Sequence, residues 1–196
     1  MGARANLSAY HPGEEDLAIR LDLDGEALDH ALNLLLAAAE HHGGIEKIVQ
    51  ALELKAELFA DAFAKKGADL TPENFLKLCM FMPTVRRRMG DYADGAEFLA
   101  LKEAIEELFE DGDADARVAR FQDRFPQGKK FRWVRDLAAE ILHNTNRELY
   151  PLMTRWVWDA RVNTGVLREI WHDENGIPAG AIKVEDNFAT FAMLRE

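Results

Sequence analysis

The sequence predicts a compact all-α domain built as a bundle of about seven helices. Apolar residues recur through most of the chain at the three- and four-residue spacing of an amphipathic helix. The chain has 196 residues, of which 48% are hydrophobic and 30% are charged, so it can bury one substantial core. We therefore expect a single helical domain over residues 17–196, preceded by an irregular N-terminal arm over residues 1–16.

The first half of the chain carries clear start and stop signals for helices. The Gly43-Gly44 pair ends the first helix, and Thr71-Pro72 supplies the N-cap and first position of a short helix that Pro83 stops. Asp94 begins another helix, and the acidic run 110–115 ends it and caps the next. We expect helices over about 25–42, 45–66, 72–82, 94–109 and 113–125.

The second half predicts three more helices and a short ribbon. The helices are expected over about 129–146, 151–173 and 186–196. Apolar and charged residues alternate in 18–23 and again in 181–185, which is the period of a half-buried strand. Pairing of these two pieces would join the ends of the domain in a two-stranded ribbon.

The residue inventory excludes several kinds of site. Cys79 is the only cysteine, so no disulfide within the chain and no paired-cysteine zinc site can form, and we expect a small buried hydrophobe there. Ser8 is the only serine and lies in the arm, which argues against a serine nucleophile on a rigid turn. Neither standard glycine-rich phosphate loop occurs. Without a signal-like leader or a membrane-length apolar run, we expect a cytoplasmic protein.

Charge and tryptophan are distributed unevenly. Residues 1–116 contain 11 Lys/Arg and 24 Asp/Glu, a net charge of −13, whereas residues 117–172 contain 11 and 6, a net of +5. The last 24 residues contribute 2 and 5, a net of −3, which brings the total to −11. All four tryptophans lie in the basic segment. Such asymmetry indicates either a partner surface or attraction between the two parts of the folded domain.

The basic segment contains a predicted binding surface. On a helix over 151–173, Trp158, Arg161 and Arg168 would share the polar face, and exposed Trp and Arg dominate interface hot spots. Cations also alternate with aromatic rings earlier in the segment, at Lys129, Lys130, Arg132 and Trp133. We expect these residues to bind an acidic protein or another anionic ligand, without catalysis and without a cofactor. A competing interpretation has Trp158 covered by the C-terminal segment and the arginines paired with the acidic half.

A metal site is the alternative hypothesis. Glu140 and His143, and Glu169 and His172, form two Glu-x-x-His motifs, and positions i and i+3 share one face of a helix. Di-iron carboxylate bundles use two such motifs with further glutamates, so the pattern is compatible with an Fe or Mn enzyme. Only 29 residues separate the motifs, which leaves no room for the intervening helix of that pattern.

Two further hypotheses concern partners. Cations interleaved with rings are also compatible with nucleic acid, although the acidic balance of the whole chain disfavours it. The wide apolar surface of the 45–66 helix leaves a homodimer open.

Lys129-Lys130, the run 137–143 and Tyr150-Pro151-Leu152 lie within a stretch of about thirty residues. This stretch resembles part of the helix-hairpin-helix glycosylases. The glycine-rich hairpin of that family is missing, and Thr154 stands where its catalytic aspartate would lie, so the resemblance does not predict glycosylase activity.

Overall fold

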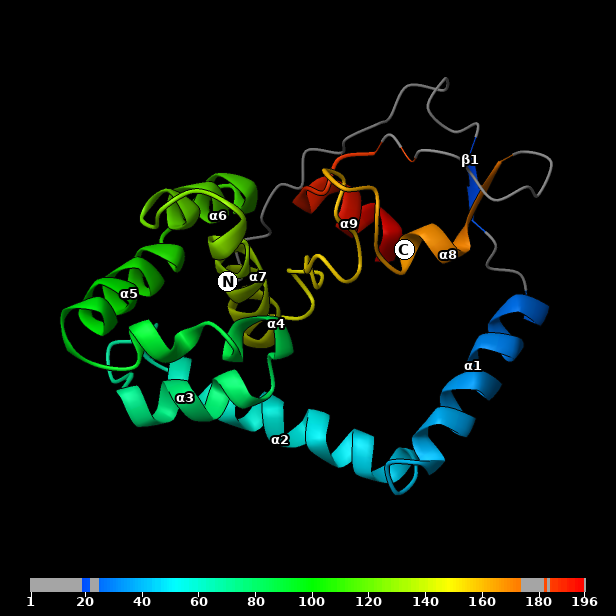
Figure 1. The fold of residues 1–196 in the computed structure, drawn as a ribbon, viewed down its shortest axis with the longest axis horizontal. Coiled ribbons are helices and arrows are strands. Elements are labelled where there is room, and N and C mark those ends of the chain that lie inside the picture. Colours follow the sequence, from blue (N-terminus) through cyan, green and yellow to red (C-terminus); the bar gives the residue numbers. More distant parts are fainter. Residues whose placement is uncertain (1–18, 22–24, 174–181, 183, 196) are drawn as a thin grey trace, which may run out of the picture.

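In a computed structural model the chain is mostly helical, and the predicted all-α class is confirmed. The structure describes residues 19–21, 25–173, 182 and 184–195 (Figure 1). The predicted arm over residues 1–16 lies outside them, and the single-domain assignment stays a prediction. The elements are β1 (Ile19–Leu21), α1 (Gly25–Glu40), α2 (Ile45–Phe63), α3 (Pro72–Met80), α4 (Pro83–Arg86), η1 (Met89–Tyr92), α5 (Gly95–Leu108), α6 (Ala114–Asp123), η2 (Lys129–Phe131), α7 (Trp133–Thr145), α8 (Leu167–Ile170), β2 (Trp171–Asp173) and α9 (Phe188–Arg195).

Helices α2 to α7 form the main bundle. Helix α7 is at its centre and contacts α2, α4 and α6, while α5 packs against α6. Phe59, Leu101, Leu137 and Ile141 are fully buried in the shared core. A smaller apolar cluster lies on another side of α7, where Ala139 meets residues of the C-terminal segments. None of the helices in the described part of the chain combines the length and apolar character needed to cross a membrane.

Two of the helix starts predicted in the first half are confirmed by their caps, whereas the side chain of Asp94, the expected cap of α5, accepts no capping hydrogen bond. Thr71 Oγ1 accepts a hydrogen bond from Asn74 N at 3.2 Å, and Asp113 Oδ2 accepts one from Ala116 N at 2.9 Å. Gly43 and Gly44 adopt φ of 89° and 94°, a left-handed conformation that ends α1 and turns the chain into α2.

The predicted helix over 151–173 is wrong. Residues 151–166 form turns, and only α8 is helical. Asp159 and Thr164 instead form an isolated antiparallel bridge around a tight turn, in which Asn163 has φ of 53°. Gly165 has φ of 133°, and a Cβ there would lie 2.4 Å from the carbonyl oxygen of Val157, so this close approach requires glycine.

The ribbon exists, but its predicted partner is wrong. Strand β1 pairs antiparallel with β2, so that Arg20 lies opposite His172. Of the expected partner segment 181–185, the described residues are not in a strand, and Ile182 is buried in the smaller cluster. Strand β2, which follows α8 directly, takes the place beside β1. Ile182 packs in the smaller cluster and does not form strand pairs.

Helix α1 stands away from the main bundle. Figure 1 shows it meeting α2 at a corner and running back toward the ribbon. Its contacts with the rest of the chain are mainly those with α2.

Candidate anion-binding pocket

A polar pocket of about 340 Å³ lies where α6 and α7 meet the segment 153–161. Phe131 and the turn 125–128 form part of its wall. Its charged wall residues come from segments far apart in the sequence. They are Arg132, Arg135, Arg155 and Arg161, with Asp115, Asp159 and Asp186. We refer to this site as the arginine pocket.

Three of the four guanidinium groups are held by aspartates. Arg132 pairs with Asp159, and Arg135 pairs with both the carboxylate and the carbonyl oxygen of Asp186. The Arg155 pair involves Asp136, a fully buried residue just behind the wall. Arg155 Nε lies 3.2 and 3.1 Å from the two Asp136 oxygens, and its Nη2 lies 2.6 Å from Oδ2. In this side-on bidentate geometry the guanidinium group lies against the carboxylate, and the hydrogen bonds hold Arg155 in one orientation.

Two donor groups in the pocket are unused by the described residues. Arg161 is exposed and forms no hydrogen bond or ion pair with any of them. The Nε of Arg132 is buried and likewise has no partner within the described part of the chain. The wall carries four arginines against three aspartates, a net of +1. An anionic group entering the pocket would therefore find the Arg161 guanidinium available, whereas Arg132 Nε is covered by protein.

Asp115 links the pocket to the last helix. Its carboxylate accepts the Phe188 backbone N–H at 2.8 and 3.0 Å, at the start of α9. Burial raises the pKa of this carboxyl above its usual value, and the nearby Asp113 and Asp186 charges raise it further. The hydrogen bond from Phe188 and the charge of Arg135 oppose the rise in this pKa. The pocket therefore contains one carboxyl group that gains a proton more readily than an exposed aspartate.

Only some of the residues predicted to bind a partner are exposed. Lys129, Lys130, Arg161 and Arg168 are exposed. Arg132 is partly buried against Asp159.

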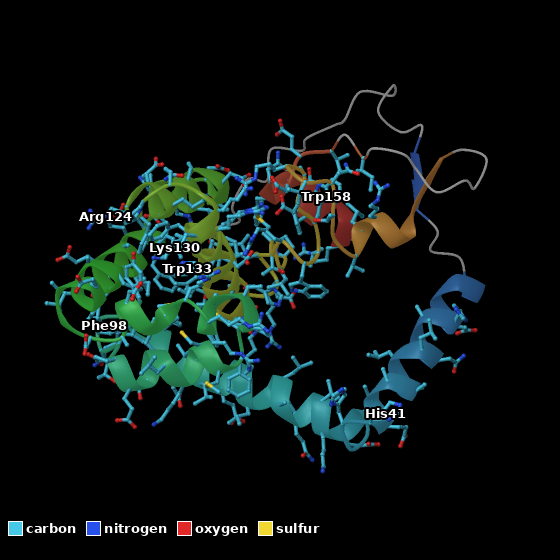
Figure 2. All side chains as sticks on the ribbon, in the orientation of Figure 1. His41, Phe98, Arg124, Lys130, Trp133 and Trp158 are labelled. Carbon is cyan, nitrogen blue, oxygen red and sulfur yellow. The ribbon has the colours of Figure 1, made fainter. Side chains whose placement is uncertain are left out.

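Trp133 and Trp158 correct the prediction, because they are buried, with 3% and 0% of their area exposed. Trp133 packs edge-on against Tyr92 and Phe125 in the main bundle, and Trp158 Nε1 donates to the Val184 carbonyl at 3.0 Å. Figure 2 shows the two rings in separate parts of the molecule. The competing interpretation of Trp158 thus describes this residue correctly.

The exposed tryptophan of this segment is Trp156. Helical spacing placed Trp156 inward and Trp158 outward, but Trp156 is 54% exposed. The reversal follows from the turn structure, because faces assigned at 100° per residue do not apply to a non-helical backbone. Val166 N donates to the Trp156 carbonyl at 2.9 Å, and Val166 is exposed as well.

The first Glu-x-x-His motif is bound to protein groups. Glu140 Oε2 lies 2.6 Å from Lys55 Nζ and 3.1 Å from Asn144 Nδ2. His143 Nδ1 donates to the Tyr150 carbonyl oxygen at 2.9 Å. Burial lowers the pKa of His143 below its usual value, despite this hydrogen bond. Both residues of the motif are thus accounted for by packing and hydrogen bonding.

The second motif does not have the predicted helical geometry. Glu169 is in α8, but that helix ends at Ile170 and His172 lies in β2, so the two do not share a helix face. Their side chains are outside the described ones. Within the described residues, no three His, Cys, Asp or Glu side chains form a group that could hold a metal ion.

Comparison with protein families, curated proteins and solved structures finds no match to this chain. The fold and the pocket therefore define it only as a mostly helical protein with an arginine-lined cavity.

Arg135 belongs to the run 129–135 in which cations alternate with aromatic rings, but sequence reasoning missed Arg155 and the aspartates that hold the arginines of the pocket. The net positive charge of residues 117–172 correctly indicated the part of the chain that contains the pocket arginines. It carried no information on which arginines meet at one pocket.

Proposed function

We propose that this chain is a non-catalytic binding protein that holds an acidic segment of a partner protein at the arginine pocket. The observation that carries the proposal is the convergence of four arginines on one cavity, two of them with unused donors. Guanidinium groups bind carboxylates through two parallel hydrogen bonds, which gives direction as well as affinity. We also infer a cytoplasmic location, supported by the single cysteine of the chain.

The charge balance of the pocket favours carboxylates over a polyanion. Three aspartates offset most of the arginine charge, so the wall keeps a net of only +1. A protein that tracks a phosphate backbone relies on many uncompensated cations, and this chain has a net charge of −11. A glutamate or aspartate side chain carries a single charge and suits the exposed guanidinium of Arg161, which is the one arginine of the pocket wall without a partner among the described residues.

Neighbouring groups extend the proposed site. Lys129 and Lys130 are exposed on η2, whose last residue Phe131 lines the pocket. Trp156 is exposed on the segment that also carries Arg155 and Arg161. A bound peptide could place one carboxylate in the pocket and further acidic groups beside the lysines, where rim charges mainly speed association.

Arg161→Ala provides the test, with fluorescein-labelled hexaglutamate as the probe and fluorescence anisotropy as the measurement. Losing one charge-assisted contact should weaken binding by roughly tenfold. The melting temperature should not change, because Arg161 is exposed and has no partner among the described residues. Labelled hexaglutamine should not bind.

Arg87→Ala is the matched control, since Arg87 is an exposed arginine outside the pocket wall. It should bind hexaglutamate as the wild type does. Equal affinities of the two variants, or no binding of hexaglutamate by the wild type, would contradict the proposal.

A further inference from the structure

The stretch 31–39 of helix α1 is apolar on almost every side and yet mostly exposed. Residues 31–39 read Ala-Leu-Asn-Leu-Leu-Leu-Ala-Ala-Ala, with one polar side chain in nine. Leu32, Leu34 and Leu35 are 50%, 58% and 50% exposed, and of this stretch only Ala39 is buried. A helix that is apolar on all sides is normally buried on all sides. Among the described side chains of α1, those that its own chain covers are confined to the last turn.

The uncovered surface continues onto the first half of α2. Val49 and Leu52 are exposed there, and Leu52 borders a mostly apolar groove of about 340 Å³. Ile48, Phe81 and the stem of Lys55 also line this groove. We refer to α1 with residues 45–54 as the elbow; Figure 2 labels His41 at its corner.

We propose that two copies of this chain associate through their elbows, with α1 of each copy seated against α1 and the groove of the other. The spacing on α1 suits this arrangement. Leu28, Leu32 and Leu35 follow one another at intervals of four and three residues, which is the spacing of a coiled-coil seam, and the next seam position, Ala39, is already buried by its own chain. The positions that flank the seam are Asp29, Ala31, Leu36 and Ala38, so only one of the four flanking side chains is charged.

The charges of the elbow also favour a second copy. Helix α1 carries Glu26, Asp29 and Glu40 but no lysine or arginine. The groove that would receive it is bordered by Lys47, for which no ion pair occurs among the described residues, whereas the neighbouring Lys55 is paired with Glu140. An acidic side chain on one α1 can therefore pair with Lys47 at the groove of its partner.

The area of the elbow is sufficient for a stable dimer. Helix α1 and residues 45–54 form two helical stretches about 24 and 15 Å long and about 11 Å across. One copy loses ~600–700 Å² of accessible surface when almost half of the circumference of both stretches is covered. Two copies together then bury ~1,300 Å², which is within the range of specific interfaces. A flat partner surface would cover only one side of α1, whereas the two arms of a second elbow cover it from two sides.

Light scattering during gel filtration tests the proposal, from about 1 to about 100 µM protein. The wild type should have twice the 22.2 kDa mass of one chain. Leu35→Glu should run as a monomer, because it places a charge in the apolar seam of both copies and raises the dissociation constant by ~100-fold or more. Leu52→Glu, on the other arm of the elbow, should do the same and serves if Leu35→Glu fails to fold.

Leu99→Glu is the matched control, because Leu99 is a leucine on α5 that is 61% exposed and outside the elbow. It should remain a dimer. A monomeric wild type at the highest concentration, or an unchanged mass for both elbow variants, would overturn the proposal. Binding of hexaglutamate at the arginine pocket is measured separately, so failure of either proposal is distinguishable from failure of the other.

Discussion

Replacing Glu140 by glutamine tests the charge pair between α2 and α7. Lys55 Nζ and Glu140 Oε2 are 2.6 Å apart, and the two side chains are only 11% and 9% exposed. The variant keeps a hydrogen-bond acceptor but leaves the ammonium group nearly buried without its counter-charge. Breaking one half of such a pair costs ~3–5 kcal/mol. We expect the lower end of this range, ~3 kcal/mol, because the amide oxygen still accepts a hydrogen bond.

Urea unfolding followed by fluorescence of the buried tryptophans measures this loss. The double variant Lys55→Met/Glu140→Gln should recover most of the lost stability, since no unpaired charge remains. Glu73→Gln is the matched control, because Glu73 pairs with Lys77 at 2.8 Å on the exposed side of α3 and should lose no measurable stability.

The reasoning fails if Glu140→Gln is as stable as the control, or if the double variant is no more stable than Glu140→Gln. Stabilisation of the wild type by added Fe(II), absent in Glu140→Gln, would instead support the metal hypothesis.

Three further predictions follow from burial and from the pKa shifts. Trp158→Ala should cost ~3–5 kcal/mol in urea unfolding, whereas exposed Trp156→Ala should change the free energy of unfolding by less than ~0.5 kcal/mol. Because the pKa of His143 is lowered in the folded state, the unfolded state binds more protons below pH 6.5, so stability should fall as the pH drops below 6.5 and His143→Gln should remove that part of the fall. Because the pKa of Asp115 is raised, its charge opposes folding at neutral pH. Asp115→Asn should therefore gain stability relative to the wild type between pH 4 and pH 7, and a constant difference across this range would contradict that assignment.

Local signals predicted the first half of the fold because its determinants are near neighbours in the sequence. The Thr71 and Asp113 caps each involve a backbone amide three residues away, and the Gly43-Gly44 stop acts within one turn. Apolar periodicity also indicates that Phe59 and Ile105 face the core, and both are buried, but the same periodicity put Val49 and Leu52 on the inner face of α2, where they are exposed.

The same periodicity misled in 151–173. Apolar residues there match a helical face, but the segment is rich in aromatic and β-branched residues, which are weak helix formers. Asn163 and Gly165, in the middle of the expected helix, are the two positions that adopt positive φ. Asparagine and glycine are typical of turns, so these two residues favoured a turn over a helix. Without a helix, the helical spacing that predicted an exposed Trp158 would not have applied.

The arginine pocket could not be derived in this way. Arg132 and Asp159 are 27 residues apart, and Arg135 and Asp186 are 51 apart. Such pairs depend on how the C-terminal segments fold back over α7, and neither spacing nor composition encodes that path. Only the enrichment of cations in the region was visible.

Folding leaves the charge asymmetry of the chain largely in place. The arginines of the pocket take their carboxylates from Asp136, Asp159 and Asp186, all in the last third of the chain. Across the boundary, Arg120 and Arg124 reach glutamates at the end of the acidic half, in pairs that are mostly exposed and therefore weak. The buried pair across the boundary, Lys55 with Glu140, takes its cation from the acidic half. Among the described residues, the arginines of the basic segment thus gain little from the acidic half.

The carboxylates of the elbow remain available as a result. Asp29, Glu40 and Glu53 form no ion pair with any described residue. The two proposed surfaces therefore differ in chemistry as well as in position: the elbow is apolar with an acidic rim, and the pocket is lined by arginines. A dimer formed through the elbows leaves both pockets accessible, so each dimer presents two sites and gains avidity for a partner with repeated acidic segments. Leu35→Glu should accordingly leave the affinity for hexaglutamate unchanged while it lowers the avidity for a surface coated with that peptide.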